Sequence, residues 1–293
     1  ETGSLDTWKI QNVEIDLNGK TLTLGHPLVG SNNTKTSGIR VLAYSKLSIR
    51  NGKVSGLGSN ALRGIQNYGE LVVEDVVFEE MTSAYDTLGN FGTLELKGNT
   101  TVPNGSESAI LNSTYMYSDD SQVPVELKIE EAGVKVGKIK VDMTESTHPQ
   151  TGVTNESNPV ITISSGEIEE IISEGTDKEL VGGVTGGTFE VKVPEEMCAD
   201  GFIPSEANDE GKYSVEVGEY LVEMTVNGVT TKYETINEAV ANAPVASYAE
   251  GKAGSEATKA TIKLLDNVEG GFDVGVETGS LDTWKIQNVE IDL

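Results

Sequence analysis

Apolar and polar residues alternate along three stretches of the chain, 42–49, 66–73 and 89–96, and the same order of residue types returns in each. The matched positions, which stand 24 and then 23 residues apart, are Leu47, Leu71 and Leu94; Ile49, Val73 and Leu96; and Tyr44, Tyr68 and Phe91. Alternation predicts β-strands. A fixed period near two dozen residues predicts repeated units that bury their apolar sides by stacking on one another.

The repeat predicts the fold class: an all-β chain wound as a right-handed parallel β-helix, which is a solenoid, with a C-terminal cap and a short capping helix. Each unit supplies one coil, so like side chains are expected to stack on like inside the tube. Asn67 and Asn90 share the 23-residue spacing beside a turn. We expect their side-chain amides to form a short ladder.

The pattern is less regular on both sides of these three coils. Residues 8–24 alternate and predict a first coil, in which Leu22 lies 25 residues before Leu47 and is expected to join its ladder. Residues 103–122 are rich in Ser, Asn and Gly and predict a loop outside the stack. Strand alternation resumes at 125–129.

Two domains are predicted. Residues 1–217 form the β-helix with its C-terminal cap, which covers the strand edges left open at the end of a stack. Residues 218–293 hold a hairpin signal at Asn227-Gly228 and a helix that begins with a capping box at Thr235. We interpret this second segment as a hairpin, a capping helix and the first strands of the next tandem module.

Residues 1–17 and 277–293 are identical, letter for letter. Either the parent protein carries near-identical tandem modules, or the duplication was engineered. If the first copy fills the first coil, the second has no equivalent place in the same module. Its apolar face would then pack on the exposed start of another chain's stack, a head-to-tail contact that does not close on itself. We therefore expect self-association through this segment.

Charge and composition narrow the partners. The chain has 293 residues, with 21 Lys and Arg against 47 Asp and Glu and a formal net charge of -26. Such an acidic chain is a poor ligand for nucleic acid or anionic membrane surfaces. No apolar run reaches the length needed to insert in a membrane. The single cysteine, Cys198, excludes an internal disulfide framework.

Catalytic and metal-binding constellations are not recognisable in the sequence. Paired glutamates recur, but acidic pairs on strands are typical of solvated faces, and Asp119-Asp120 lies in the predicted loop. The two histidines, His26 and His148, lack zinc-site spacing. We predict no catalytic residue, no metal, no cofactor and no enzymatic activity. A polysaccharide lyase or glycoside hydrolase acting on acidic glycans stays open as the minor alternative, because known enzymes share the fold.

Two sets of residues are candidates for binding. Arg40 and Arg63 stand 23 residues apart and Asp86 another 23 on, so they are expected to stack as a polar patch, or as a surface ion ladder of little energetic value. Tyr85, Tyr115 and Tyr117 fall outside the aromatic ladder. These tyrosines are contact candidates, because an exposed Tyr combines apolar area with a hydroxyl. A tyrosine lying back on the solenoid is the alternative.

A family resemblance rests on two groups of motifs. The run from Tyr233 to Ala243 followed by 260–268, and the run from Gly186 to Val191 followed by 198–202 and 209–215, resemble the opening and closing segments of β-helix modules in large cell-wall surface proteins of gut Clostridia and related Firmicutes. The resemblance implies an extracellular location on a bacterial cell surface.

The same resemblance implies a non-catalytic role in adhesion, in binding a host protein or a glycan, or as a stalk. Some gut bacterial surface proteins bind immunoglobulins as superantigens, so immunoglobulin binding is an alternative function. The motifs themselves say nothing about the ligand.

Overall fold

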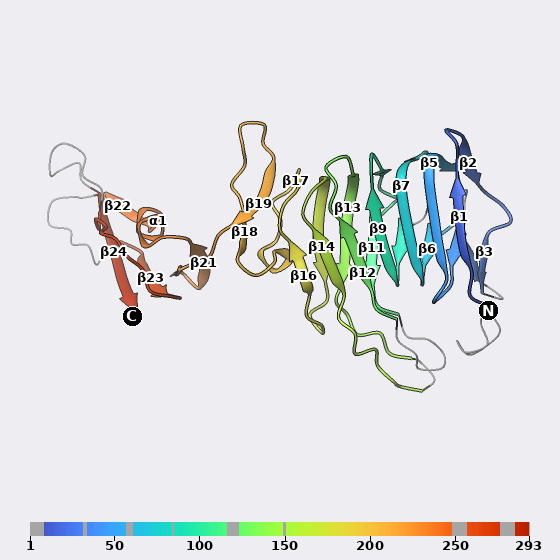
Figure 1. Cartoon of the computed structure of the whole chain (residues 1–293). Coiled ribbons are helices and arrows are strands. Elements are labelled where there is room, and N and C mark those ends of the chain that lie inside the picture. Colours follow the sequence, from blue (N-terminus) through green and yellow to red (C-terminus); the bar gives the residue numbers. More distant parts are fainter. Residues whose placement is uncertain are drawn as a thin grey trace. The chain divides into compact units, whose positions relative to one another are not determined.

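The structure is a computed structural model of the chain, and it describes residues 9–31, 34–56, 61–83, 85–115, 123–148, 151–247, 257–275 and 285–292. Within these residues the chain forms two compact units, 1–217 and 218–293. The chain is all-β, with long sheets of parallel strands that curl, and this architecture is consistent with a β-helix-like fold. Figure 1 shows the strands of the first unit lying side by side in chain order.

The parallel strands of the first unit form three rows. Row 1 consists of β1 (Asn12–Asp16), the first half of β5 (Lys46–Gly56), the first half of β7 (Glu70–Glu79), β9 (Thr93–Lys97), β12 (Glu126–Ile129), β14 (Val160–Ile163) and β16 (Val181–Val184). Every neighbouring pair in this row is parallel.

Rows 2 and 3 take up the remaining strands. Row 2 consists of β2 (Thr21–Leu24), the second halves of β5 and β7, β10 (Thr101–Val102), the starts of β13 (Lys135–Asp142) and β15 (Glu167–Glu174), and β17 (Thr188–Phe189). Row 3 consists of β4 (Thr34–Val41), β6 (Arg63–Asn67), β8 (Asp86–Asn90), β11 (Ser108–Ser113) and the ends of β13 and β15. The short strand β3 (Val29–Ser31) pairs antiparallel with β4.

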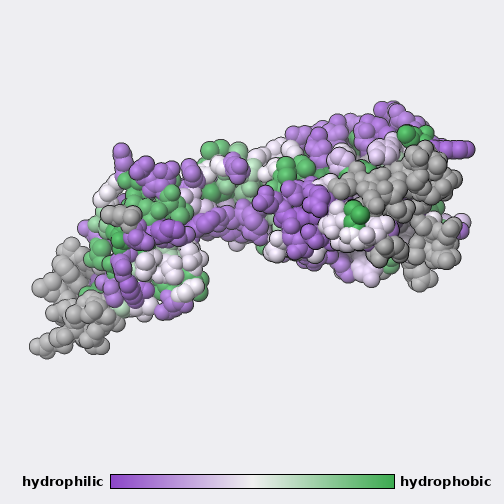
Figure 2. Space-filling model, turned by 90° about the horizontal axis from the view of Figure 1, so that it is seen from below, coloured by the Kyte–Doolittle hydropathy of each residue, from purple (hydrophilic) through white to green (hydrophobic). Residues whose placement is uncertain are grey.

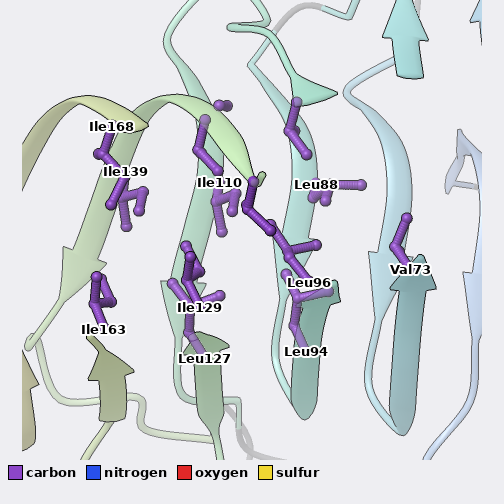
Figure 3. Packing of buried hydrophobic residues seen from close by; sticks show 14 of the residues in the cluster. Val73, Leu88, Leu94, Leu96, Ile110, Leu127, Ile129, Ile139, Ile163 and Ile168 are labelled. Carbon is purple, nitrogen blue, oxygen red and sulfur yellow. The ribbon is translucent and has the colours of Figure 1, made fainter. Parts of the chain in front are cut away.

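The core lies between the rows and is built from like residues in register. Leu47, Leu71 and Leu94 occupy successive partner positions of row 1, as the repeat predicts. The ladder continues into Leu127 and Ile161, and these side chains are buried. Figure 3 shows the aliphatic side chains of neighbouring strands meeting in this interior. Burying each such side chain contributes roughly 1.5–3 kcal/mol, so the stacked aliphatics are the main source of stability.

A ladder of buried amides runs through row 3, next to the turn that leads into row 1. Asn67 Nδ2 donates to Asn90 Oδ1 (2.8 Å), and Asn90 Nδ2 donates to Asn112 Oδ1 (2.7 Å). Asn67 and Asn90 also donate to the backbone oxygens of Thr93 (2.8 Å) and Glu126 (2.9 Å). The predicted Asn67–Asn90 contact is confirmed, and the ladder has a third member that the sequence pattern did not reveal.

Two predictions about the stack were wrong. Leu22 does not join the Leu47 ladder, because β1 and β2 pair with different halves of β5: Val13 lies opposite Leu47, and Leu22 lies opposite Val54. The predicted loop 103–122 contains β11, a fully buried strand of row 3. Its six residues do not alternate between apolar and polar, because both faces of this strand are covered.

The last parallel strand of row 2 is followed by a change of direction, in the segment that the sequence predicts as the cap. β17 pairs antiparallel with β19 (Tyr213–Val217), which also pairs antiparallel with β18 (Phe202–Pro204). A short 3₁₀ helix, η2 (Glu195–Met197), precedes β18 and buries Met197. Antiparallel pairing at this end ends the addition of further parallel strands.

In its described residues, the second unit is a small mixed sheet with one helix. The hairpin of β20 (Val222–Val226) and β21 (Val229–Tyr233) turns at Asn227-Gly228, where both residues have positive φ. The helix α1 (Ile236–Ala241) begins at Thr235 with a complete capping box, as predicted. The remaining strands are β22 (Val245–Ser247), β23 (Lys259–Leu264) and β24 (Lys285–Asp292), and β23 pairs parallel with β24.

Replacing Asn90 with alanine tests the amide ladder. The change removes the middle member and leaves the buried Oδ1 of Asn112 without its donor, so we expect a loss of about 2–4 kcal/mol from the free energy of unfolding. The measurement is urea denaturation followed by circular dichroism. The control is Asn237→Ala, at an exposed position of α1. Equal midpoints for the two variants would contradict a structural role for the ladder.

Candidate functional site

The outer side of row 3 carries an unusual set of side chains. Arg40, Gln66, Gly89 and Leu111 occupy successive partner positions on β4, β6, β8 and β11. They alternate with the partly buried Ile39 and the buried Ile65, Leu88 and Ile110, which partner one another in the same way. Since side chains alternate along a strand, the first set faces away from the core.

Arg63 lies along this outer side and forms an ion pair with a buried carboxylate. Its Nε stands 3.0 Å from Asp86 Oδ2, and the Asp86 side chain is only 2% exposed. Ser108 Oγ donates to the other oxygen of Asp86 (2.6 Å). A Cβ on Gly89 would lie 2.3 Å from Arg63 Cδ. The absence of a side chain at Gly89 therefore provides the space in which the arginine crosses the strand.

Each of the two arginines covers an aromatic ring. The Arg40 guanidinium lies 5.4 Å from the ring centroid of Tyr68, and the Arg63 guanidinium lies 5.3 Å from that of Phe91. The two rings stack at 5.1 Å with an interplanar angle of 20°. Tyr115 meets both rings edge-on, at 4.9 Å and 6.0 Å. We call these five residues the arginine–aromatic cluster.

Two tight turns bring the rings into line. Tyr68-Gly69 and Phe91-Gly92 connect row 3 to row 1, and each glycine lies directly against the turn of the preceding repeat. A Cβ on Gly92 would stand 2.2 Å from the backbone oxygen of Gly69, so a larger residue would push the turns apart. Glycine at both positions therefore sets the close spacing at which neighbouring rings stack.

The cluster combines a rigid base with an exposed edge. Tyr68 and Phe91 are buried, in a small apolar group with Ala43, Leu111 and Val123. The Tyr68 hydroxyl accepts from Gln66 Nε2 (2.7 Å), whose amide oxygen accepts from Ser37 Oγ (3.0 Å). Tyr115 is 40% exposed. A fixed aromatic platform with cationic groups on it can bind a planar or acidic group by stacking and hydrogen bonding.

The predicted binding residues are distributed unevenly. Arg40, Arg63 and Tyr115 come together in the cluster. Tyr85 is 41% exposed but precedes β8, whereas Phe91 follows β8, so it lies at the other end of that strand. Tyr117 and the pair Asp119-Asp120 lie outside the described residues.

Two details of the predicted stacking were wrong. Arg40 is not the partner of Arg63, because β4 and β6 pair with an offset of 26 residues, which places Ser37 opposite Arg63. Tyr44 does not stack on Tyr68: it lies in a longer turn with a positive φ of 63° and is 56% exposed. The ring ladder holds only for Tyr68 and Phe91.

Sequence reasoning missed Gln66, Gly89 and Leu111 as parts of this surface. Gly89 had a usable signal, since a glycine inside a strand pattern indicates close approach of another group. Gln66 and Leu111 had none. Leu111 lies on the outer side because β11 pairs with β8, and β11 was not predicted as a strand. Gln66 lies there because β6 pairs with β4 and β8.

A second surface feature lies over row 2, next to the cap. It is a groove of about 930 Å³ lined in part by Lys135, Glu167, Glu169, Glu190 and Lys212. Lys135 forms an ion pair with Glu167 (2.8 Å), and Lys212 forms one with Glu190. In the view of Figure 2, polar residues cover most of the visible surface and apolar residues form small separate patches.

Two further features are absent from the residues that the structure describes. These residues contain no group of three or more His, Cys, Asp and Glu side chains placed to hold a metal ion. None of the helices in the described part of the chain is long and apolar enough to cross a membrane.

In comparisons with protein-family models, curated proteins and solved structures, no match to this chain was found. The resemblance to surface-protein modules therefore stays a prediction from the motifs.

Replacing Arg63 with alanine tests the ion pair at the base of the cluster. The buried Asp86 loses its cation, so we expect a loss of about 3 kcal/mol from the free energy of unfolding. Arg50→Ala is the matched control, because Arg50 pairs with Glu14 (2.6 Å) at a site where both side chains are more than 40% exposed. Such pairs contribute about 0–1 kcal/mol. Equal losses in urea denaturation would show that the Arg63 pair is an ordinary surface pair.

The thiol of Cys198 provides a test of burial in the cap. Burial, together with the negative charges of Glu195 and Glu196, raises the pKa of this thiol from 9.0 to about 11. At pH 8 we therefore expect alkylation of the folded chain to be about a hundredfold slower than that of the urea-unfolded chain, because the thiolate is the reactive form. The rate should rise with pH up to about 11.

The same pKa shift affects stability. The folded state favours the protonated thiol, so this contribution is present below pH 9 and is lost as the pH rises from 9 towards 11. Equal alkylation rates for the folded and the unfolded chain at pH 8 would show that the thiol is open to solvent.

Proposed function

We propose that the three rows of the first unit wind as a right-handed parallel β-helix, so that one strand from each row makes up one coil. Strands of rows 3, 1 and 2 follow one another in this order along the chain, and each pairs with the strand of the same row in the next repeat. Crossover connections between parallel strands are right-handed in about 98% of cases. This winding accounts for the stacking of like residues.

We further propose that the chain is a non-catalytic repeat module of a bacterial surface protein, and that it binds a host protein through the arginine–aromatic cluster. The observation that carries this proposal is the stacking of Arg40 and Arg63 on two aligned rings with the half-exposed Tyr115 beside them. A few residues carry most of the binding energy of a protein interface, and tyrosine and arginine are enriched among them. A solenoid flank supplies an extended rigid surface around them.

The charge distribution supports a selective contact surface. The chain carries a formal net charge of -26 and has only three arginines, two of which lie in this cluster. Acidic residues outnumber basic ones in the chain as a whole, so the overall charge repels acidic regions of a partner and a cationic site of this kind attracts them. Immunoglobulin is one candidate partner, and the location on the cell surface is part of the same proposal.

Capture from biological fluids tests the binding role. The immobilised chain is incubated with human serum and mucosal secretions, and retained proteins are identified by mass spectrometry. We expect saturable enrichment of one host protein, with antibody fragments tested separately. Tyr115→Ala and Arg40→Ala should each weaken binding by roughly tenfold or more, whereas Tyr85→Ala, at the other end of β8, should not.

Two outcomes would contradict this assignment. Retention no greater than on an unrelated acidic protein would favour a stalk without a ligand, and a glycan array would then test the sugar-binding alternative. Equal loss of binding with Tyr85→Ala and Tyr115→Ala would move the contact surface away from the cluster.

A further inference from the structure

The strongest unexplained feature of the molecule is that one sequence forms a strand in both units. Residues 1–17 and 277–293 are identical, so Asn12–Asp16 in β1 has the same sequence as Asn288–Asp292 in β24. In both places these five residues pair with a parallel neighbour, but the neighbour differs. The two pairings together show what this strand is able to bind.

In the first unit the neighbour is β5. Val13 lies opposite Leu47 and Ile15 lies opposite Ile49. Within the described residues β5 is the one strand paired with β1. The edge of β1 that faces away from β5 therefore has no strand along it in the described part of the chain.

In the second unit the neighbour is β23. Asn288 lies opposite Lys259, and the parallel register continues to Asp292 opposite Lys263. The strand β22 pairs antiparallel with residues 285–287 of β24 and with no later residue of that strand. These three residues directly precede the five positions whose counterparts in β1 pair with β5.

The two neighbours belong on opposite edges of the strand. Ile15 packs against the core of the first unit, and Val13 lies on the same side of the strand. Their counterparts Val289 and Ile291 pack against the core of the second unit. The connection from β23 to β24 and the connection from β1 to β5 both join parallel neighbours, and such crossovers are right-handed. When the same side of a strand faces the core, right-handed crossovers place the preceding strand on one edge and the following strand on the other. β23 precedes β24 and β5 follows β1, so the two neighbours belong on opposite edges.

The charges of the strand agree with two simultaneous neighbours. Glu14 pairs with Arg50 of β5 (2.6 Å), and its counterpart Glu290 pairs with Lys259 of β23. One glutamate of this sequence is therefore recognised by a cation on either side. A strand held between β23 and β5 would bring both cations to the same carboxylate.

We propose that two copies of this chain join head to tail by strand exchange. In this arrangement β24 of one copy occupies the place of β1 against β5 of the next copy, while it stays paired with its own β23. The second unit then becomes the N-terminal cap of the neighbouring stack. In a tandem array the same strand would join successive modules covalently.

Exchange is favoured over simple addition of β24 beside β1. Side-by-side, in-register pairing of identical strands would place Glu290 against Glu14 and Asp292 against Asp16, and like charges directly opposite one another are destabilising. Exchange avoids both repulsions. The strand it displaces is weakly held at its start, since Val13 is 40% exposed and Ile10, which precedes β1, is 66% exposed.

Because the two strands are identical, one substitution can be placed in either copy as a matched pair. Ile15→Asp weakens the pairing of β1 with β5 and leaves β24 unchanged. β24 of another copy then replaces β1 more readily, so association should strengthen by about tenfold. Ile291→Asp weakens the donor strand, so association should weaken by a similar factor. Association of the full chain is measured by sedimentation velocity over a range of concentrations, and circular dichroism checks that each variant stays folded.

The outcomes separate exchange from its alternatives. Strengthening by Ile15→Asp together with weakening by Ile291→Asp supports the proposal. Weakening by both variants would mean that β24 adds beside β1, which overturns exchange. A chain that stays monomeric at every concentration, in all three forms, overturns it too.

A cross-linking experiment tests the register. Chains with Cys198→Ala receive one new cysteine, either Ser48→Cys or Glu290→Cys, and are mixed before a short thiol cross-linker is added. Ser48 is the partner of Glu14, the counterpart of Glu290, so mixed dimers are expected. Thr230→Cys on β21, at the far side of the second sheet, replaces Glu290→Cys as the control. Equal yields with both partners would contradict the register.

This inference uses the proposed β-helix winding but not the proposed binding role. None of the substituted positions belongs to the arginine–aromatic cluster. Loss of host-protein capture with intact self-association would therefore count against the binding role alone, and a monomeric chain that still captures its partner would count against exchange alone.

Discussion

The register between successive parallel strands is the constraint on which the rest of this structure depends. Each strand pairs with the equivalent strand of the next repeat, so one aliphatic position generates a continuous ladder, as from Leu47 to Leu71 and Leu94. A shift of one residue would turn every inward side chain outward. The same register aligns the buried amides of Asn67 and Asn90, which add a directional constraint to the non-directional packing of the core.

Parallel pairing in register also brings charged side chains of neighbouring strands together, and at several partner positions of this chain the two charges are opposite. Lys46 lies opposite Glu70, Lys135 opposite Glu167 and Arg63 opposite Asp86, and each pair forms a salt bridge. Opposite charges at partner positions stabilise a sheet modestly, whereas like charges destabilise it. Most of these pairs are exposed and contribute little, so a chain with a net charge of -26 depends on its core for stability.

The candidate binding surface and the proposed junction lie on different surfaces of the stacked strands: one on their outer flank and the other at a strand edge. The arginine–aromatic cluster occupies the outer flank, where small residues such as Gly89 and Gly92 let large side chains lie flat or align closely. The proposed junction uses the edge of β5 at the start of the stack, where β24 of another copy would replace β1. A parallel fold must cover such an edge in some way. A flank contact and an edge contact do not compete, so a module can bind a partner and join its neighbour at once.

The sequence alone determined the repeating strands, the Leu47 ladder, the hairpin at Asn227-Gly228 and the capping box at Thr235, because each depends on neighbours along the chain or on a constant spacing. Only the tertiary structure decided where the spacing changes. The strand β11 has both faces buried, so its residues carry no alternation, and the third asparagine of the ladder stayed hidden.

The candidate site shows the same division. The residue types of Arg40, Arg63 and Tyr115 marked them as binding candidates, but equal spacing suggested that the arginines stack on each other. Because β4 and β6 pair with an offset of 26 residues, Arg40 lies opposite Gln66 and not opposite Arg63. Each arginine instead covers an aromatic ring. The number of residues between paired strands changes from 26 for β4 and β6 to 23 for β6 and β8, so a constant period in the sequence does not predict it.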